Sequence, residues 1–420
     1  MRPRRPLALV CVSAALLSAC GVLPGGSDGR HTVTVWLMQN SASPEFLRRF
    51  TADFERTHKD IRVDIRIQQW TGIVEKVQTA LKSDSAGAPD VIEVGNTQVP
   101  QYVEGGRLTD LTLESMRDWG KEHWLPGLAE PGRDDSRQYG IPWYAANRVV
   151  IYRKDLFRKA GITSPPRTRD EWLSDTERLD SGGNQGIYLA GQDWYTLSGF
   201  IWDEGGDLAV ETDAAWQGAL DSQAALRGMD FYRRLQALGA GPVDADEEHP
   251  PQAQVFASGQ VAQLIAVPGL AQSIVQENPE LKDEIGYFPV PGRTAAHPGA
   301  VFTGGSDLVV PQNTDRPYDA TAVVGALAGA KWDTELARTM NYVPNKTTLA
   351  GAVAGSEGVA AMAAGAAQGR ATPNTPDWPA VEAANPIKGY MTKVLRGADP
   401  ATEARRASRR ITELLAPDFG

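Results

Sequence analysis

The stretch DVIEVGNTQV, residues 90–99, reads as a short apolar strand that stops at three small polar residues. Those residues are Gly95, Asn96 and Thr97, and none of them is an acid, a base or a nucleophile. Amides, hydroxyls and backbone N–H groups hydrogen-bond a neutral ligand, and they supply nothing that cleaves a bond. The end of this strand therefore predicts a cleft for an uncharged molecule rich in hydroxyl groups.

The chain before this strand alternates between strand and helix patterns. Residues 33–38 read as a buried strand, 44–59 carry an apolar helical face, 61–67 alternate, and 73–81 show a second helical stripe. Three strands joined by two helices predict an α/β fold with a parallel, doubly wound sheet and right-handed crossovers. Ligands of such sheets lie beyond the carboxyl ends of the strands.

The later elements are less regular. They are predicted as a strand over 147–153, a helix over 154–160, a helix opening at 165–172, a mostly helical middle over 168–284, strands over 286–289 and 301–311, loose helices over 349–369, and an amphipathic helix over 401–415.

The N-terminus reads as an export signal. Arg2, Arg4 and Arg5 precede the apolar run 7–17, which is too short to span a bilayer as a mature helix. The following Leu-Ser-Ala-Cys-Gly resembles a bacterial lipobox, which predicts cleavage after residue 19 and lipid attachment at Cys20. An ordinary signal peptide with a chance cysteine is the alternative, and the arginine pair leaves twin-arginine export open. Residues 20–31 then form a flexible tether.

Composition narrows the class of protein. The chain has 420 residues, 42% of them hydrophobic, which is enough for two cores rather than one. The full chain has 42 basic and 52 acidic residues. Cleavage of the signal removes three arginines, so the mature chain has 39 basic residues and a net charge of −13. No basic patch appears, which argues against nucleic acid as a partner. The two cysteines, Cys11 and Cys20, both precede the mature body, which therefore has no disulfide.

Several phrases of this sequence, kept in order, resemble the extracellular solute-binding proteins of carbohydrate importers, the group that includes maltose-binding protein. They are DVIEVGNTQVPQYVEGGRLTDL (90–111), YGIPWYAANRVVIYRKDLFRKAGI (139–162), GFIWDEGGDL (199–208), VFTGGSDLVVP (301–311) and ATPNTPDWPAVEAA (371–384). The resemblance covers essentially the whole mature chain. Leu270, where relatives often carry a tryptophan, and Ser306-Asp307 after the glycine pair depart from the pattern.

The resemblance implies a type II periplasmic-binding-protein fold with two α/β lobes, each a mostly parallel sheet, and a sugar cleft between them. Lobe 1 is expected over 32–144 and 303–342, and lobe 2 over 145–302 and 343–420. The implied protein is a lipid-anchored monomer on the outer face of the cell membrane. It captures a neutral di- or oligosaccharide by hinge closure and delivers it to the permease of an ABC importer, whose ATPase is another chain.

A sugar presents hydroxyl edges and two faces of C–H groups, so its site needs polar groups together with flat aromatic rings. An indole that covers about 80 Å² of C–H surface contributes roughly 2 kcal/mol at ~25 cal/mol/Å². For the tryptophans and the tyrosine a core position is the alternative, and Asn96 or Thr97 can be helix caps. The candidate ligand contacts are Gln39, Asn40, Trp70, Asn96, Thr97, Trp143, Tyr144, Trp202, Asp203, Gly305, Ser306, Asp307 and Trp378.

Catalytic and metal sites find little support in the sequence. A glycoside hydrolase needs two opposed carboxylates, whereas the adjacent Asp203 and Glu204 point apart. The G-x-S-x-G match at 25–29 lies in the tether, with no strand before it. The five histidines have no zinc spacing, no Walker A motif is present, and no cofactor is expected. Polyamines, peptides, phosphorylated solutes and iron remain alternative ligands of the same fold.

Overall fold

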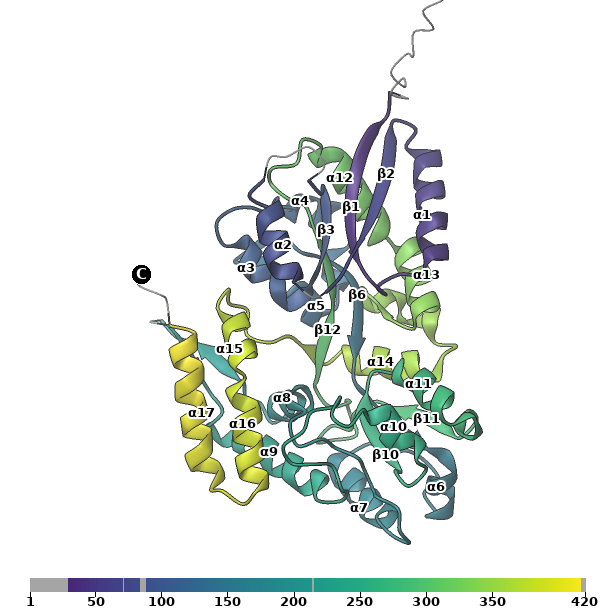
Figure 1. Cartoon of the computed structure of the whole chain (residues 1–420), viewed down its shortest axis with the longest axis vertical. Helices are drawn as coiled ribbons and strands as arrows, with labels where there is room; N and C mark the ends of the chain where they lie inside the picture. Colours follow the sequence, from purple (N-terminus) through teal and green to yellow (C-terminus); the bar gives the residue numbers. More distant parts are fainter. Residues whose placement is uncertain (1–28, 71, 84–87, 214, 417–420) are drawn as a thin grey trace, which may run out of the picture.

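The computed structural model describes residues 29–70, 72–83, 88–213 and 215–416. Its elements gather into two lobes stacked along the long axis of the molecule (Figure 1). The predicted export signal, Cys20 and most of the tether lie outside the described residues. No helix in the described part of the chain combines the length and the apolar character needed to cross a membrane.

Lobe 1, the upper body in Figure 1, contains the first half of the predicted elements and two later helices. Its elements are β1 (His31–Met38), α1 (Pro44–Thr57), β2 (Ile61–Gln68), α2 (Ile73–Ala80), β3 (Val91–Gly95), η1 (Asn96–Gln98), α3 (Val99–Val103), α4 (Thr112–Arg117), η2 (Lys121–His123), α5 (Pro126–Ala129), β4 (Arg133–Asp134), β5 (Arg137–Gln138), α12 (Pro317–Leu327) and α13 (Ala330–Met340).

The main sheet lies in lobe 1 and has the strand order β13-β6-β12-β3-β1-β2. Strands β1, β2 and β3 are parallel, as predicted, and β12 runs antiparallel to both β3 and β6. The chain enters β1 at the end of lobe 1 farthest from lobe 2, so the carboxyl ends of the parallel strands face lobe 2 (Figure 1).

The apolar stripe of α1 explains how the sheet is covered. Phe46, Phe50 and Phe54 recur at helical spacing and are buried, and the rings of Phe46 and Phe50 each meet Trp332 of α13 at 5.5 Å. Each buried phenylalanine contributes roughly 2 kcal/mol relative to exposure. Ser43 caps the helix by accepting a hydrogen bond from the Phe46 N–H.

Four short segments connect the lobes or lie at their junction: β6 (Ile141–Asn147), β12 (Val301–Val309), β13 (Val343–Pro344) and η4 (Thr347–Val353). Strands β6 and β12 pair antiparallel between the lobes, so β6 leads from lobe 1 to lobe 2 and β12 leads back (Figure 1). The single strand predicted over 147–153 is in fact the end of β6 and a separate strand β7, with Arg148 between them.

Lobe 2, the lower body, is built mainly from helices. Its elements are β7 (Val149–Arg153), α6 (Lys154–Lys159), α7 (Arg169–Leu179), α8 (Trp194–Asp203), β8 (Ala209–Glu211), β9 (Trp216–Gly218), α9 (Gln223–Gln236), α10 (Gln252–Ala257), β10 (Gln263–Ala266), α11 (Leu270–Glu277), η3 (Pro279–Leu281), β11 (Ile285–Phe288), α14 (Glu357–Ala366), β14 (Gly369–Arg370), α15 (Trp378–Ala384), α16 (Pro386–Leu395) and α17 (Pro400–Leu414).

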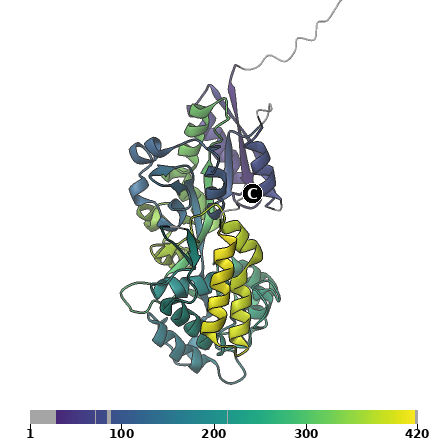
Figure 2. The same cartoon turned by 90° about the vertical axis from the view of Figure 1, so that its left-hand side faces the viewer.

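The sheet of lobe 2 differs from the prediction of a mostly parallel sheet. Its order is β10-β7-β11, and β7 is antiparallel to both neighbours. The helix predicted from 165 begins only at Arg169, because Thr168 and Glu171 form a capping box there. Helices α16 and α17 pack side by side on this lobe (Figure 2), and their apolar residues join those of α8 and α9 in one core.

Candidate functional site

The structure brings three of the predicted contacts together at the edge of lobe 1 that faces lobe 2. Strands β1 and β2 are in register with Met38 opposite Gln68, and the Gln39 N–H continues the pairing by donating to the Gln68 carbonyl at 2.8 Å. Gln39, Asn40 and Trp70 therefore follow adjacent strand ends. Gln39 and Asn40 are exposed, and Asn40 holds the turn with φ +68°, a conformation that asparagine tolerates.

Trp70 is the exposed aromatic residue of this edge. Its fractional exposure is 43%, which is high for a tryptophan in a folded protein. An exposed ring beside amide groups provides the two kinds of contact that a sugar requires.

Asn96 and Thr97 follow the end of β3, and they differ in how deeply they are buried. The Asn96 amide is buried and donates to the Gly127 and Thr303 carbonyls at 3.0 Å each, so its N–H groups are committed to protein partners. Thr97 lies half-buried in η1. Asn96 thus joins η1 to α5 and β12, and of the two residues only Thr97 remains accessible.

Glu93, within the stretch that opened the sequence analysis, organises the polar residues behind the edge. This fully buried carboxylate accepts hydrogen bonds from the Met38 N–H (2.7 Å), Ser41 Oγ (2.6 Å), Ser306 Oγ (2.7 Å) and Tyr144 Oη (3.2 Å). Burial raises the pKa of Glu93, and these donors oppose that shift. Tyr144 and Ser306, both predicted ligand contacts, are buried inside this network.

Three further predicted contacts of lobe 1 belong to its framework. Trp143 is fully buried, and its indole packs in the core with no face toward solvent. Gly305 pairs with Ala145 in the sheet, where a Cβ would stand 2.1 Å from the Tyr144 carbonyl oxygen. Asp307 is fully buried, and burial raises the pKa of its carboxyl group well above the ordinary value.

Trp202, Asp203 and Trp378 are also placed away from an open surface. Trp202 is buried, donates from Nε1 to Asp207 at 3.0 Å, and lies under the Arg370 guanidinium at 5.5 Å. Asp203 forms an ion pair of 2.9 Å with the buried Arg169, which also pairs with Glu204 at 3.2 Å. The prediction that these two acids point apart is therefore wrong, because one arginine holds both. Trp378 is buried in the core of lobe 2, and its Nε1 donates to Glu382 at 2.9 Å.

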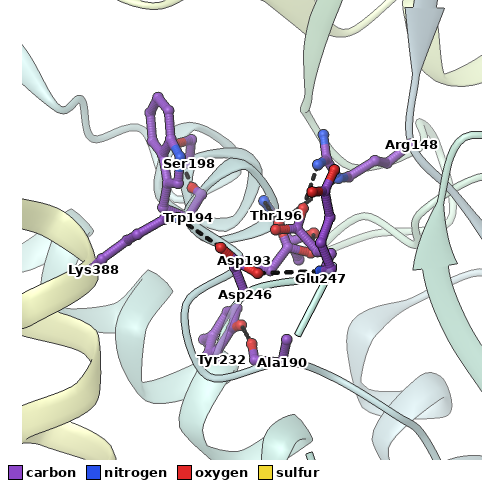
Figure 3. Close-up of polar contacts among 11 residues, drawn as sticks. Arg148, Ala190, Asp193, Trp194, Thr196, Ser198, Tyr232, Asp246, Glu247 and Lys388 are labelled. Carbon is purple, nitrogen blue, oxygen red and sulfur yellow. Dashed lines mark hydrogen bonds and ion pairs between the residues drawn. The ribbon is translucent and has the colours of Figure 1, made fainter. Parts of the chain in front are cut away.

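Lobe 2 presents a charged cluster that was not predicted, formed by Arg148, Asp193 and Glu247 (Figure 3). Arg148 stands where β6 passes into β7, donates to Glu247, and lies 3.7 Å from Asp193. The side chains of Arg148 and Glu247 are each 21% exposed, whereas that of Asp193 is fully buried. One arginine and two acids therefore meet at this surface of lobe 2.

Asp193 also stabilises the N-terminus of α8. It caps α8 by accepting from the Thr196 N–H (3.1 Å) and the Thr196 hydroxyl (2.6 Å). Burial, reinforced by the charge of Glu247, raises the pKa of Asp193 to about 7, although Arg148 acts in the opposite direction. The loop that carries Glu247 is held by the neighbouring Asp246, which pairs with Lys388 of α16 at 3.3 Å (Figure 3).

Aromatic rings border this cluster. The Arg148 guanidinium lies 4.8 Å from the ring of Tyr195, which in turn packs on Trp194 at 4.1 Å and on Phe302 at 4.5 Å. Arg148, Tyr195 and Phe302 line one small pocket at the start of β12. Tyr195 and Phe302 are only partly buried, so this surface combines aromatic faces with a donor and an acceptor, as the exposed edge of lobe 1 does.

Sequence reasoning missed this surface because its residues are far apart in the chain. Arg148 and Tyr195 lie within or beside phrases that were singled out, but Glu247 comes from a loop with no motif. The detectable signals were an arginine between two apolar strands and the Asp-Trp-Tyr sequence at the start of a helix.

A larger cavity of about 480 Å³ lies between the turn at 130–135 and residues 207–216 and 370–374. Glu130, Asp134, Asp135, Asp207 and Glu211 are among the residues that line it, together with Arg133 and Arg370. Asn374 connects its two sides by donating to the Glu130 and Arg133 carbonyls. Trp216 adds an indole to this lining. Among the described residues, no group of histidines, cysteines and acids is arranged to hold a metal ion.

Comparison with known proteins identifies the family of this chain. A model of the family described as bacterial extracellular solute-binding protein matches residues 40–334. The chain is 34% identical to the diacetylchitobiose-binding protein DasA of Streptomyces coelicolor, an alignment that covers 98% of this chain and 99% of the relative.

Two solved structures share the fold. The sugar-binding protein MalE of Xanthomonas citri superimposes with a TM-score of 0.82 at 22% identity, covering 92% of this chain and 97% of that one. The GacH receptor of Streptomyces glaucescens, solved without ligand and with acarbose, gives a TM-score of 0.72 at 25% identity, covering 91% and 98%. The two-lobed α/β fold predicted from the sequence is confirmed.

Proposed function

This chain belongs to the bacterial extracellular solute-binding proteins, and from that premise we propose that it captures diacetylchitobiose, or a closely similar short oligosaccharide, for delivery to an ABC importer. The observation that carries the proposal is the similarity to the diacetylchitobiose-binding relative over nearly the whole length of both chains. The family is extracellular by description, so this chain acts outside the cytoplasm.

The Arg148 surface suits such a ligand. Each N-acetyl group of the disaccharide offers one N–H donor and one carbonyl acceptor. Glu247 can accept from the N–H and Arg148 can donate to the carbonyl, since both side chains are partly exposed and retain hydrogen-bonding capacity. Tyr195 and Phe302, which pack on each other and are partly exposed, are the aromatic residues proposed to meet the C–H surface of the sugar.

Capture works through closure of the lobes. A ligand shifts the population toward a closed state only through contacts that the closed state completes. The proposed contacts are Trp70, Gln39, Asn40 and Thr97 on lobe 1 and the Arg148 surface on lobe 2. As the lobe boundaries we propose 32–144 with 303–342 and 145–302 with 343–420.

A binding screen tests the ligand. The purified protein is heated with diacetylchitobiose, maltose and mannitol in parallel, and affinities are then measured by calorimetry. Sugar at 100 times its dissociation constant stabilises the folded state by roughly 2.7 kcal/mol. We expect diacetylchitobiose to raise the melting temperature most and to be recovered uncleaved. A response to maltose alone, or cleavage of the sugar, would refute the proposal.

We propose lipid attachment at Cys20 as a separate point, supported by the lipobox-like sequence before it. Cys20→Ser should release the protein from the membrane fraction into the medium, while Cys11→Ser serves as the matched control and leaves retention unchanged. Retention of the Cys20→Ser protein would contradict the anchor. A monomeric mass in solution is expected for the released form.

A further inference from the structure

The buried carboxylate of Glu93 gathers four donors from three segments that are distant in sequence. Met38 and Ser41 belong to the end of β1 and its turn, Tyr144 to β6, and Ser306 to β12. The hydroxyl groups also contact one another, since Tyr144 Oη lies 3.1 Å from both Ser41 Oγ and Ser306 Oγ. One side chain thus ties the turn of lobe 1 to the paired strands that run between the lobes.

A third segment between the lobes joins the same network through Tyr342, the residue before β13. The Tyr342 ring stacks on Tyr144 with centroids 4.1 Å apart and planes inclined by 9°. Its hydroxyl donates to the Asn40 carbonyl at 3.2 Å. The turn at 39–41 is therefore held from one side by Glu93 and from the other by Tyr342.

This turn follows the end of β1 that faces lobe 2 (Figure 1), and Gln39 and Asn40 in it are exposed. Its backbone has little freedom, because Asn40 is in the left-handed region and Ser41 is buried against Glu93. Glu93 and Tyr342 fix this turn against β6 and β12 at the points where the two strands leave the lobe 1 sheet for lobe 2. A change in the bend of either strand there therefore shifts the turn, and restraint of the turn limits that bending.

We propose that Glu93 is a positioning residue, which couples the turn at 39–41 to the segments that connect the lobes and so sets the range of interlobe angles. A sugar held by the turn then restricts lobe movement through Glu93. The link to the sugar rests on the proposed function, whereas the control of lobe angle does not depend on which ligand binds.

A carboxylate suits this position better than an amide. Oε1 faces three hydroxyl groups and Oε2 faces the Met38 N–H, so all four neighbours donate to an acceptor. In Glu93→Gln one of these positions becomes an NH₂ donor. The hydroxyl groups can rotate to accept from it, which lets the protein fold but loosens the network.

The test measures the distance between lobes directly. Spin labels are attached at Leu113→Cys on α4 and Arg234→Cys on α9, both exposed positions, in the full chain carrying Cys11→Ser and Cys20→Ser. Distance distributions are recorded with and without 1 mM diacetylchitobiose, and its affinity is measured by calorimetry. Gln263→Met is the control, because Gln263 forms a buried network with Trp172 and Thr176 wholly within lobe 2.

We expect Glu93→Gln to broaden the distance distribution without sugar and to weaken binding about tenfold, whereas Gln263→Met changes neither. Equal widths for Glu93→Gln and the control would overturn the proposal, whatever the loss of stability. If the parent protein does not bind the sugar, the proposed function fails, but the widths without sugar still decide the role of Glu93. If Glu93→Gln does not fold, Ser306→Ala is measured in its place. It removes one hydroxyl group of the network, and a distance distribution no wider than that of the control would overturn the proposal.

Discussion

The strand ends of lobe 1 and the Arg148 surface of lobe 2 both carry polar and aromatic side chains, but they use them differently. Behind the edge of lobe 1, Asn96, Tyr144 and Ser306 are buried and hydrogen-bonded to protein groups. On lobe 2, Arg148 and Glu247 are partly exposed beside the ring of Tyr195. Polar residues at a strand end can therefore stabilise the fold, while polar side chains that are accessible to a ligand lie on the other lobe.

This difference has a physical origin. A sheet whose central strands continue into the second lobe must satisfy many buried polar groups at the point of departure, because an unpaired group there costs roughly 1–3 kcal/mol. Glu93 and Asn96 meet that need. The chain enters lobe 2 between β6 and β7. Arg148, the residue between these two strands, is partly exposed.

Replacing Arg148 should have the largest effect on sugar binding. Arg148→Met removes the cation between Asp193 and Glu247 and the group proposed to donate to the ligand. We expect affinity to fall about a hundredfold, near 2.7 kcal/mol, and stability to fall by about 3 kcal/mol because two partly or fully buried acids lose their partner. Calorimetry and urea unfolding measure the two effects. Lys154→Met, which breaks an exposed pair with Glu357, is the control and should change neither.

The second largest effect on sugar binding is expected for Trp70, the exposed indole of lobe 1. Trp70→Ala should weaken sugar binding about tenfold, near 1.4 kcal/mol, with no loss of stability, since 43% of the residue is already exposed. Trp143→Phe, a change in the buried core, should show the reverse pattern of lower stability with retained affinity. Unchanged affinity in Trp70→Ala would remove Trp70 from the site.

Asp193→Asn should mainly change how the stability of the folded protein depends on pH. Burial and Glu247 raise the pKa of Asp193 to about 7, so between about pH 4 and pH 7 the folded protein keeps a proton that the unfolded chain releases. The stability that this group contributes is present at low pH and is lost as pH rises toward 7. The stability of the parent relative to Asp193→Asn should therefore decline across that window and level off above it. Parallel urea midpoints at all pH values would contradict this assignment.

Asn96→Ala gives the smallest expected effect on binding and separates the two regions most cleanly. Loss of the amide leaves the buried Gly127 and Thr303 carbonyls without this donor, which should cost about 2 kcal/mol of stability. The affinity of the folded protein for the sugar should stay within twofold of the parent. A tenfold loss in calorimetry would show that the ligand reaches Asn96 after all.

The sequence predicted the architecture of lobe 1 well, because hydrophobic period and strand order are local signals. Strands β1, β2 and β3 and helix α1 lie close to their expected bounds. The antiparallel sheet of lobe 2 was not predicted, since the pairing of β7 with β10 and β11 joins residues more than a hundred positions apart.

The site was harder to predict, because burial depends on long-range packing. Trp70 and Trp143 are both tryptophans at or near strand ends, yet one is exposed and the other lies in the core. Glu93 had no local signal either, because a glutamate within an apolar strand pattern does not reveal which donors surround it. Glu247 had no local signal, and its role arises only from its position beside Arg148.

Hydrogen exchange of the backbone in the presence of diacetylchitobiose tests the central claim most directly. The account predicts that the sugar slows exchange in two separate segments, one containing Gln39 or Trp70 on lobe 1 and one around Tyr195 on lobe 2. Protection confined to a single lobe, or centred on the cavity at 130–135 and 370–374, would contradict it.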